Sequence, residues 1–169
     1  RGMELCKHPY TRPVGDDAEW DSKNFIVDRD PGSLGGGLGE LAVMMSGRYD
    51  QRQIHVYTDK HSQWNLGLDF RYTDGTHQVK TGIIITTGGA IIVKPAHFAT
   101  TADWIHLLGG GYWFMGRADD WRLVVDKFRQ YCASIGEDLP SGNRDWYLEP
   151  EWLQQYGIQQ LPLFDWAFK

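Results

Sequence analysis

The sequence lacks most of the features that point directly to a chemistry or a compartment. It holds only two cysteines among 169 residues, Cys6 and Cys132, in no CxxC or other metal-ligand spacing. This usage indicates an intracellular protein with reduced thiols, in the cytoplasm or an organelle matrix. The alternative is a single long-range disulfide between the two cysteines. No apolar run approaches the roughly 18 residues of a membrane span. The first residues carry no signal-peptide pattern. A targeting segment that preceded Arg1 and was removed is an alternative compatible with the sequence. We therefore expect no membrane contact.

Catalytic motifs are also missing. No GxSxG is present, and the six histidines form neither HxH nor HxxxH. The neighbouring acids, such as Asp119 and Asp120, are adjacent in sequence and therefore point in different directions, which is typical of helix caps and solvated loops rather than of an acid–base pair. Cys132 falls on the apolar stripe of an expected helix and is expected in the core. The sequence thus predicts no catalytic residues, no metal and no cofactor, and favours a protein that is not an enzyme.

Glycine is abundant, and five of the 20 glycines crowd into residues 31–42, PGSLGGGLGELA. Gly37-x-Gly39-x-x-Ala42 matches a relaxed dinucleotide fingerprint, and Asp59 lies 20 residues beyond Gly39. That motif needs a strand leading directly into the first glycine. Here the only strand candidate, residues 25–28, ends nine residues earlier. No Lys-Ser/Thr follows the glycines either. We therefore expect a pliable loop that joins an irregular arm, together spanning residues 1–40, to a sheet.

The middle of the chain has the two-residue alternation of half-buried strands. An Asp-Gly turn over residues 73–76 and Gly88-Gly89 separate neighbouring strands. Residues 41–49 are compatible with either a strand or a short helix. The expected strands cover residues 53–58, 64–73, 79–87 and 90–95. Joined by short turns, they predict an antiparallel β-meander within residues 41–97.

Helical patterns follow in residues 98–169. Residues 100–108, TTADWIHLL, are expected to form a short helix that ends at the glycines 109–111. Residues 119–135 form the strongest candidate, and Glu149–Gly157 a Pro-started helical turn. In the second helix one apolar stripe holds Trp121, Val124, Val125, Phe128, Tyr131 and Cys132. The prediction is a single α+β domain over residues 1–169, with helices packed on one face of the sheet.

The charge is unevenly distributed. The net charge is −5, which argues against a non-specific nucleic-acid binder taken whole. Residues 41–97 nevertheless carry six Lys/Arg against four Asp/Glu, while residues 98–169 carry six against ten. Aromatic residues make up 14% of the chain and favour a large aromatic core over an aromatic recognition surface.

In the basic middle segment, cations interleave with aromatic residues, a combination that binds single-stranded nucleic acid. Alternation places Trp64, Phe70 and Tyr72 on the core face of their strand. The predicted phosphate contacts are Arg48, Arg52, Lys60, Arg71, Lys80 and Lys94, and the predicted stacking groups are Tyr49 and Tyr57. The leading hypothesis is therefore a non-enzymatic protein that binds RNA or DNA single strands on its sheet.

A loose family pattern agrees with this hypothesis. Residues 54–86 and 91–108 resemble the curved sheet and helix of the single-stranded-DNA-binding coactivators of the positive cofactor four type and of the related Whirly class, which includes mitochondrial guide-RNA-binding proteins. The pattern is DFRYTDG, a basic link, a strand and a helix with a Trp, within residues 48–108. It implies nucleic acid on the sheet, dimers or tetramers built through the helices, and no catalysis. The Whirly KGKAAL motif and the duplicated sheet-plus-helix unit are absent.

The acidic C-terminal part supports a second hypothesis. Residues 98–169 combine their net charge of −4 with a Trp-rich tail, and Trp is enriched among interface anchors. They suggest a module that binds and neutralises a basic protein partner, in the manner of an immunity protein or inhibitor. Under this hypothesis Asp145, Glu149 and Glu151 contact the partner. An enzyme whose site is assembled from distant residues is a third alternative.

Overall fold

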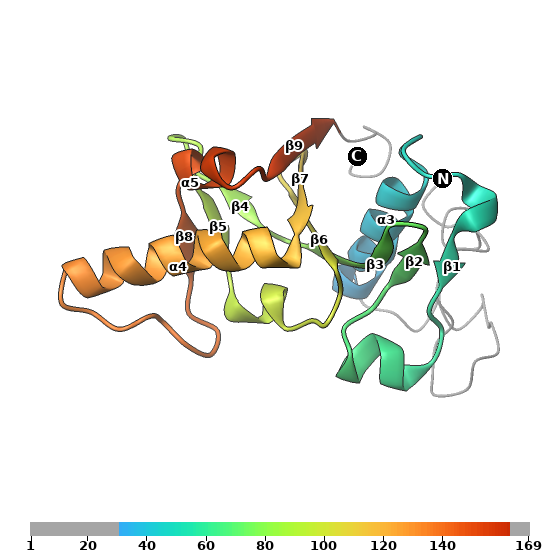
Figure 1. Ribbon diagram of the computed structural model, residues 1–169, viewed down its shortest axis with the longest axis horizontal. Coiled ribbons are helices and arrows are strands. Elements are labelled where there is room, and N and C mark those ends of the chain that lie inside the picture. Colours follow the sequence, from blue (N-terminus) through green and yellow to red (C-terminus); the bar gives the residue numbers. More distant parts are fainter. Residues whose placement is uncertain (1–30, 163–169) are drawn as a thin grey trace.

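The protein has an α+β fold, as predicted. The computed structural model describes residues 31–162, so the strand expected at residues 25–28 and Cys6 lie outside the described residues. The helices are α3 (Pro31–Met44), α4 (Ala118–Ser134) and α5 (Pro150–Gln155), with the short helical segments η1 (Gln51–Gln53), η2 (His61–Asn65) and η3 (Pro95–Phe98). Figure 1 shows α4 lying across the strands, with α3 beside β3 of the larger sheet.

The larger sheet has six strands in the order β1-β2-β3-β6-β7-β9. These strands are β1 (His55–Val56), β2 (Phe70–Tyr72), β3 (Gly75–Thr81), β6 (Trp104–Gly109), β7 (Tyr112–Arg117) and β9 (Gln159–Pro162). The β3–β6 pair is parallel and the other pairs are antiparallel. The sheet is therefore mixed, and the prediction of a purely antiparallel meander was wrong. A parallel pair needs a long crossover, and here residues 82–103 supply it.

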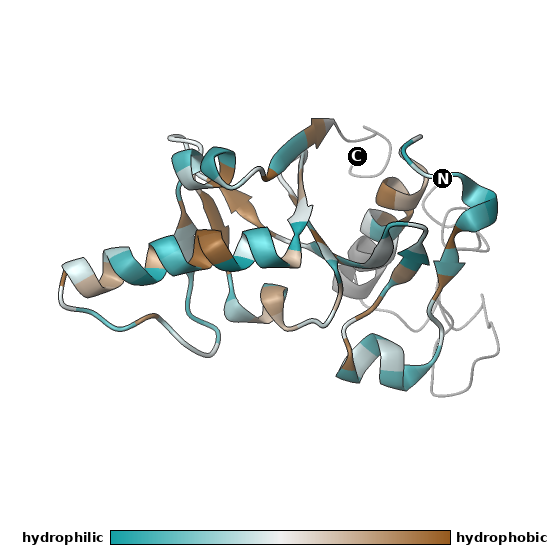
Figure 2. Cartoon of the chain, viewed as in Figure 1, coloured by the Kyte–Doolittle hydropathy of each residue, from teal (hydrophilic) through white to brown (hydrophobic). Residues whose placement is uncertain are grey.

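The crossover builds a second, smaller sheet. Its three strands, in the order β4-β5-β8, are β4 (Ile84–Ile85), β5 (Ile91–Val93) and β8 (Trp146–Leu148). Ile91, Val93 and Leu148 point into a buried cluster beneath α4. Figure 2 shows the hydrophobic colouring of β4 and β5 behind this helix. The apolar run of residues 82–93 thus belongs mostly to this second sheet.

Helices cover opposite faces of the larger sheet, not one face as predicted. Along β6, Ile105 and Leu107 belong to the buried cluster that includes α4. Leu108 instead joins the cluster that includes Leu41 and Met44 of α3. Successive side chains of a strand point to opposite faces, so α4 and α3 pack on the two sides. The sheet therefore separates an α4 core from an α3 core.

The prediction for the main helix is confirmed. Helix α4 carries Asp119 and Asp120 in its first turn, where the helix dipole favours acids, although it begins at Ala118 rather than behind an Asp119 cap. Gly136, with φ of 76°, follows its end in the left-handed conformation that favours glycine. Its stripe is buried against the sheets, Cys132 included, except for Tyr131, which is half exposed. The turn at α5 is confirmed as well.

The glycine-rich segment is a helix, α3, and not a loop. Glycine lowers helix propensity by about 1 kcal/mol per residue relative to Ala, so local preference alone does not favour this helix. Burial does: Leu41, Val43 and Met44 are almost fully covered. Gly39 shows why a small residue is useful here, since a Cβ at this position would lie 2.4 Å from Cγ2 of Thr81. The glycine allows α3 to approach β3 closely.

Two further local predictions were wrong. Residues 104–109, expected in a helix, form β6, because Ile105 and Leu107 alternate with His106 and Leu108 toward two buried faces. The glycines after it form a β6–β7 hairpin turn, with Gly110 and Gly111 at positive φ. The strand expected over residues 64–73 is shortened to β2, and the residues before it form η2 and a loop. Strands β7, β8 and β9 were not predicted, so the described residues 98–162 combine strands with helices rather than being mainly helical.

Within residues 31–162, none of the helices combines the length and the apolar character that crossing a bilayer requires.

Candidate functional site

The eight residues predicted to bind nucleic acid do not form one continuous site. Tyr49 is the clearest correction, because its side chain is only 7% exposed. Its ring packs edge-on against Phe70 and Tyr72, and its hydroxyl lies 3.8 Å from the sulfur of Met115. Burial, with a smaller contribution from the Asp74 charge, raises the pKa of Tyr49 well above its usual range. A ring held in this core cannot stack on a nucleic-acid base.

The predicted cations are dispersed. Arg52 makes two hydrogen bonds to the carboxylate of Asp50, at 3.1 and 3.0 Å. Lys94 follows β5 of the smaller sheet, with its Nζ 4.0 Å from Oδ1 of Asp145. Arg48 is exposed in the turn after α3, where its charge acts on Tyr49 and His106. Lys94 therefore lies apart from Arg48 and Arg52, and Arg52 is already paired with Asp50.

The remaining predicted residues gather around β1 and η2. His55 and Arg71 are cross-strand partners, and the rings of His55 and Tyr57 meet edge-on with centroids 5.3 Å apart. In η2, Nζ of Lys60 lies 4.5 Å above the Trp64 ring, which is 67% exposed. Lys80 lines a cavity of about 270 Å³ together with Trp64. Two acids, Glu40 and Asp69, line the same cavity. We give the name cationic–aromatic face to two neighbouring groups, His55 with Tyr57 and Arg71, and Trp64 with Lys60 and Lys80.

Trp64 was expected in the core, and its exposure is a correction. The expected alternation assumed a strand through residue 64, but this residue lies in η2. Phe70 is fully buried, as predicted, and Tyr72 packs against the α3 core. Tyr49 is therefore buried and Trp64 exposed, the reverse of the prediction, and Trp64 is a large aromatic ring at the surface beside a cation.

A chain of hydrogen bonds runs through the α3 core. It links Oδ1 of Asp74 to Nε2 of His77 at 2.7 Å, Nδ1 of His77 to Nε2 of His106 at 2.9 Å, and Nδ1 of His106 to Nε1 of Trp113 at 3.0 Å. The indole N–H only donates, so Nδ1 of His106 accepts. Nε2 of His106 then donates to His77, whose own Nε2–H donates to Asp74. Every ring nitrogen is used when both histidines are neutral.

Burial favours this neutral state. It lowers the pKa of His77, against the opposing hydrogen bond and charge of Asp74. It lowers the pKa of His106 further, helped by the charges of His77 and Arg48. Neither ring has any exposed surface, so the pair has no direct access to a ligand at the surface. Its role is to align β3, β6 and β7.

A groove runs between the C-terminal half of α4 and β8. It joins two cavities, of about 490 and 380 Å³, that share Phe128, Tyr131 and Tyr147. Lys94, Cys132, Ile135, Glu137, Pro140, Asn143, Arg144 and Asp145 complete the first cavity, and Glu149 and Trp152 the second. We call this surface the α4–β8 groove. β8 is an edge strand, since it pairs only with β5 among the described strands.

Large apolar side chains are exposed along this groove. Tyr131 is 52% and Tyr147 is 47% exposed, and Ile135 is about as open. On β8, Tyr147 is the cross-strand partner of Ile92, which in turn pairs with the exposed Ile84 of β4. These three residues form one row on the outer face of the smaller sheet. Contiguous exposed apolar surface of this kind is typical of binding surfaces.

Acidic residues border the same surface. Residues 134–155 carry five acids and one base, namely Glu137, Asp138, Asp145, Glu149 and Glu151 against Arg144. Glu137 and Asp145 line the first cavity together with the bases Lys94 and Arg144, and Glu149 lines the second. The side chains named in the second hypothesis therefore lie at or beside an aromatic groove. The apolar stripe of α4 already contained Tyr131, but its periodicity predicted burial and gave no indication of exposure.

No metal-ligand group is found among the described residues. Within residues 31–162, no three His, Cys, Asp or Glu side chains converge as metal ligands would. The only enclosed polar constellation described above, at His77 and His106, uses all its hydrogen-bonding positions internally.

By fold, the protein is of the α+β class, and it presents two surfaces of different composition, the cationic–aromatic face and the α4–β8 groove. Searches of protein-family models, curated proteins and solved structures find no match to this chain. The resemblance to the positive cofactor four and Whirly proteins consequently stays a prediction. The functional argument rests on the surfaces themselves.

Proposed function

We propose that this protein binds a basic protein partner through the α4–β8 groove. The observation that carries the proposal is the half-exposed pair Tyr131 and Tyr147, set in a segment with four more acids than bases. Tyr is enriched among the residues that dominate binding energy, and an acidic border steers a basic partner and excludes acidic ones. A partner with an apolar side chain between lysines or arginines is complementary to this arrangement.

The geometry supports a protein rather than a small molecule as the occupant. The two cavities together follow α4 and β8 over many residues and continue onto the row of Ile84, Ile92 and Tyr147. Small-molecule sites are usually more enclosed. An extended, partly apolar surface with a polar border has the anatomy of a protein interface. The function supported best is therefore capture of a basic protein, as an inhibitor or adaptor does.

The test starts with affinity capture and ends with purified components. The immobilised protein is used to capture partners at low salt, and each captured basic protein is purified and titrated against two variants. The first is Asp145→Asn/Glu149→Gln/Glu151→Gln, and the second is Tyr147→Ser. We expect each to weaken binding at least about tenfold, since charge loss slows association and Tyr loss removes an anchor.

A matched variant controls for net charge. The variant Asp59→Asn/Asp119→Asn/Asp126→Asn also removes three negative charges, but outside the groove. It is expected to bind the partner within about threefold of the unmodified protein. Equal weakening by both triple variants would reduce the effect to net charge. Unchanged affinity in the groove variants would remove the proposal.

The cationic–aromatic face supports a second candidate function, binding of single-stranded nucleic acid. The observation that favours it is the exposed Trp64 ring with Lys60 above it and Lys80 nearby. A base can stack on such a ring while neighbouring cations contact phosphates. Compared with the sequence prediction, this version replaces Tyr49 with Trp64, and Arg48, Arg52 and Lys94 make no part of the face.

A labelled single-stranded oligonucleotide tests this candidate at several salt concentrations. Binding is expected to weaken steeply with salt. Trp64→Ala should cost about 1–3 kcal/mol of binding free energy if one base stacks there. Trp152→Ala, outside the face, is the control. Absence of binding at low salt ends the nucleic-acid candidate without affecting the groove proposal.

A further inference from the structure

A separate cleft lies beside the first half of α4. It has a volume of about 280 Å³, and its lining includes three aromatic residues, Phe98, Trp121 and Trp146. Phe98 belongs to η3, Trp121 to α4 and Trp146 to β8, so three distant segments build the walls. None of the lining residues lies in the α4–β8 groove. The cleft is therefore independent of the proposed partner surface.

The walls suit a flat apolar ligand. The rings of Phe98 and Trp146 are nearly parallel, with an interplanar angle of 16° and centroids 5.8 Å apart, while Trp121 is tilted against Phe98 at 5.6 Å. The indole N–H of Trp121 already donates to the carbonyl of Ile105, so this wall offers no polar group. An apolar cavity of about 150 Å³ takes up a benzene molecule. A cleft of about 280 Å³ has room for a fused two-ring ligand.

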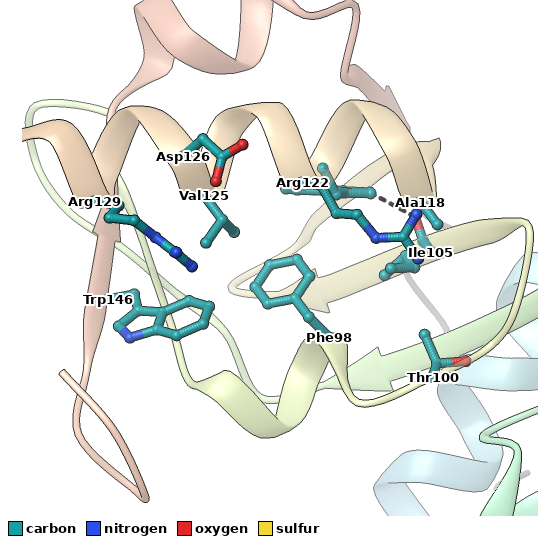
Figure 3. A pocket seen from close by; sticks show the side chains of 10 residues that line it. Phe98, Thr100, Ile105, Ala118, Arg122, Val125, Asp126, Arg129 and Trp146 are labelled. Atoms are coloured by element: carbon teal, nitrogen blue, oxygen red, sulfur yellow. Dashed lines mark hydrogen bonds between the residues drawn. The ribbon is translucent and has the colours of Figure 1, made fainter. Parts of the chain in front are cut away.

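Charged side chains of α4 stand at the mouth. Arg122, Asp126 and Arg129 line the cleft. They are spaced so that they share one side of a helix. Figure 3 shows Arg122 and Arg129 reaching out on either side of the Phe98 ring, Arg129 beside Trp146, while the shorter Asp126 stays close to α4. Arg122 is paired with Asp119. Within the described part of the chain, Arg129 makes no ion pair.

Arg129 therefore offers a guanidinium beside an aromatic wall. A guanidinium binds a carboxylate through two parallel hydrogen bonds, which fixes both position and orientation. The aromatic walls place a ring, and Arg129 places an acidic group at the edge of that ring. Asp126 excludes a second negative group from the same end of the mouth. The site thus selects for one ring system with one carboxylate.

We propose that this cleft binds a small aromatic carboxylate, with its rings against Phe98 and Trp146 and its carboxylate on Arg129. Two-ring acids of the size of naphthoate fill the cleft, and single-ring acids leave part of it unoccupied. Recognition requires both the apolar walls and the guanidinium, so neither an uncharged ring nor a small acid without a ring binds comparably.

Calorimetric titration of the full chain tests the proposal with three probes. They are 2-naphthoate, its uncharged analogue 2-naphthamide, and acetate. We expect 2-naphthoate to bind about 10–100-fold more tightly than 2-naphthamide, the range that a charge-assisted hydrogen-bonded pair supplies. Acetate should give no measurable heat at the same concentrations. Equal affinities for naphthoate and naphthamide, or no binding of naphthoate at millimolar concentration, overturn the proposal.

Variants assign the binding to this cleft. Arg129→Gln should lower naphthoate affinity to the level of naphthamide, while Arg144→Gln, an exposed arginine of the other surface, should leave it unchanged. Asp126→Asn should retain or tighten binding, since it removes a repelling charge. Arg129 is exposed, so its replacement leaves folding intact, which thermal melting verifies. Equal losses in Arg129→Gln and Arg144→Gln, or loss of binding in Asp126→Asn, place the ligand elsewhere and overturn the assignment.

Discussion

The two cores on either side of the larger sheet are built on different principles. The α4 core packs aliphatic side chains and the rings of Phe114, Trp121, Phe128 and Trp146 beneath one amphipathic helix. The α3 core encloses the bonded pair His77 and His106, stacked with Phe70 at 4.4 Å from His77. Apolar packing tolerates changes in pH, whereas a buried hydrogen-bonded chain depends on one protonation state. The α4 core is thus expected to contribute stability that does not change with pH. The α3 core is expected to contribute stability only while its two histidines are neutral.

The largest expected effect comes from truncating the two cores at adjacent residues of β6. Leu107→Ala opens the α4 core and Leu108→Ala the α3 core, and both side chains are fully buried. Each should lower the free energy of unfolding by about 2–5 kcal/mol. Denaturant unfolding, followed by both Trp fluorescence and circular dichroism, measures the loss. The exposed Leu123→Ala on α4 is the control, with an expected change within about 0.5 kcal/mol.

The same pair of variants shows whether the two cores unfold together. One sheet spans both, so a single transition is expected in each variant, with the two probes coincident. Two separate transitions in Leu108→Ala, one of them unchanged from the unmodified protein, would show that the α4 core folds without the α3 core. The two cores would then be separate folding units rather than two faces of one cooperative unit.

The next largest effect comes from breaking the hydrogen-bonded chain. His106→Leu keeps an apolar side chain of comparable size but leaves the indole N–H of Trp113 and Nδ1 of His77 without their partner. Each buried polar group that loses its hydrogen bond costs about 1–3 kcal/mol. Thermal or denaturant unfolding at pH 8 measures the sum. A loss below about 0.5 kcal/mol would show that the chain contributes little to the α3 core.

How far the sequence predicts this architecture depends on the length of each element. Helix α4 is long and strongly periodic, and its bounds were predicted to within a few residues. β6 was expected as a helix, because residues 104–108 are buried on both faces and their apolar run resembles a short helix. The glycine-rich α3 has unfavourable local propensity, and its burial in the α3 core stabilises it. Tertiary burial, which no single-chain pattern reveals, decided both.

A pH dependence is expected from the same histidines. Their folded-state pKa values lie below the unfolded value of about 6.5, so the unfolded chain binds more protons below that pH. Stability is therefore fully present above about pH 6.5 and falls as the pH decreases toward the folded-state values. Asp74 and Asp103 favour a charged His77, and Arg48 opposes a charged His106, but burial dominates in both.

The expected slope is about 1.4 kcal/mol per pH unit for each histidine in that interval. Unfolding free energies measured between pH 8 and pH 5 determine it. The α4-core variant Leu107→Ala should show the same slope from a lower starting value, since its cavity opens on the face of β6 opposite the histidine pair. His106→Leu should show a shallower one. An unchanged slope in His106→Leu would attribute the pH dependence to other groups.

For the candidate sites, the sequence indicated which kinds of residue take part, but not which of them are exposed or which lie next to one another. Lys60, Tyr57 and Arg71 lie together, whereas Tyr49 turned inward and Trp64 outward, because η2 replaced the expected strand. The acids Asp145 and Glu149 do border a groove, but the exposure of Tyr131 and Tyr147 follows from where α4 ends relative to β8. Both surfaces are assembled from segments far apart in the sequence, and local sequence patterns carry little information about how such segments pack together.

The smallest expected effect concerns the ion pair at the rim of the groove, far from both cores. Lys94 and Asp145 are 4.0 Å apart and each about half exposed. Exposed pairs contribute about 0–1 kcal/mol, less at high salt. In a double-mutant cycle with Lys94→Gln and Asp145→Asn, the coupling free energy should fall in that range and shrink in 1 M salt. A coupling well above about 1 kcal/mol would mean that this rim helps hold β5 against β8. Groove variants at Asp145 would then perturb the fold as well as partner binding, so partner binding and stability must be measured on the same samples.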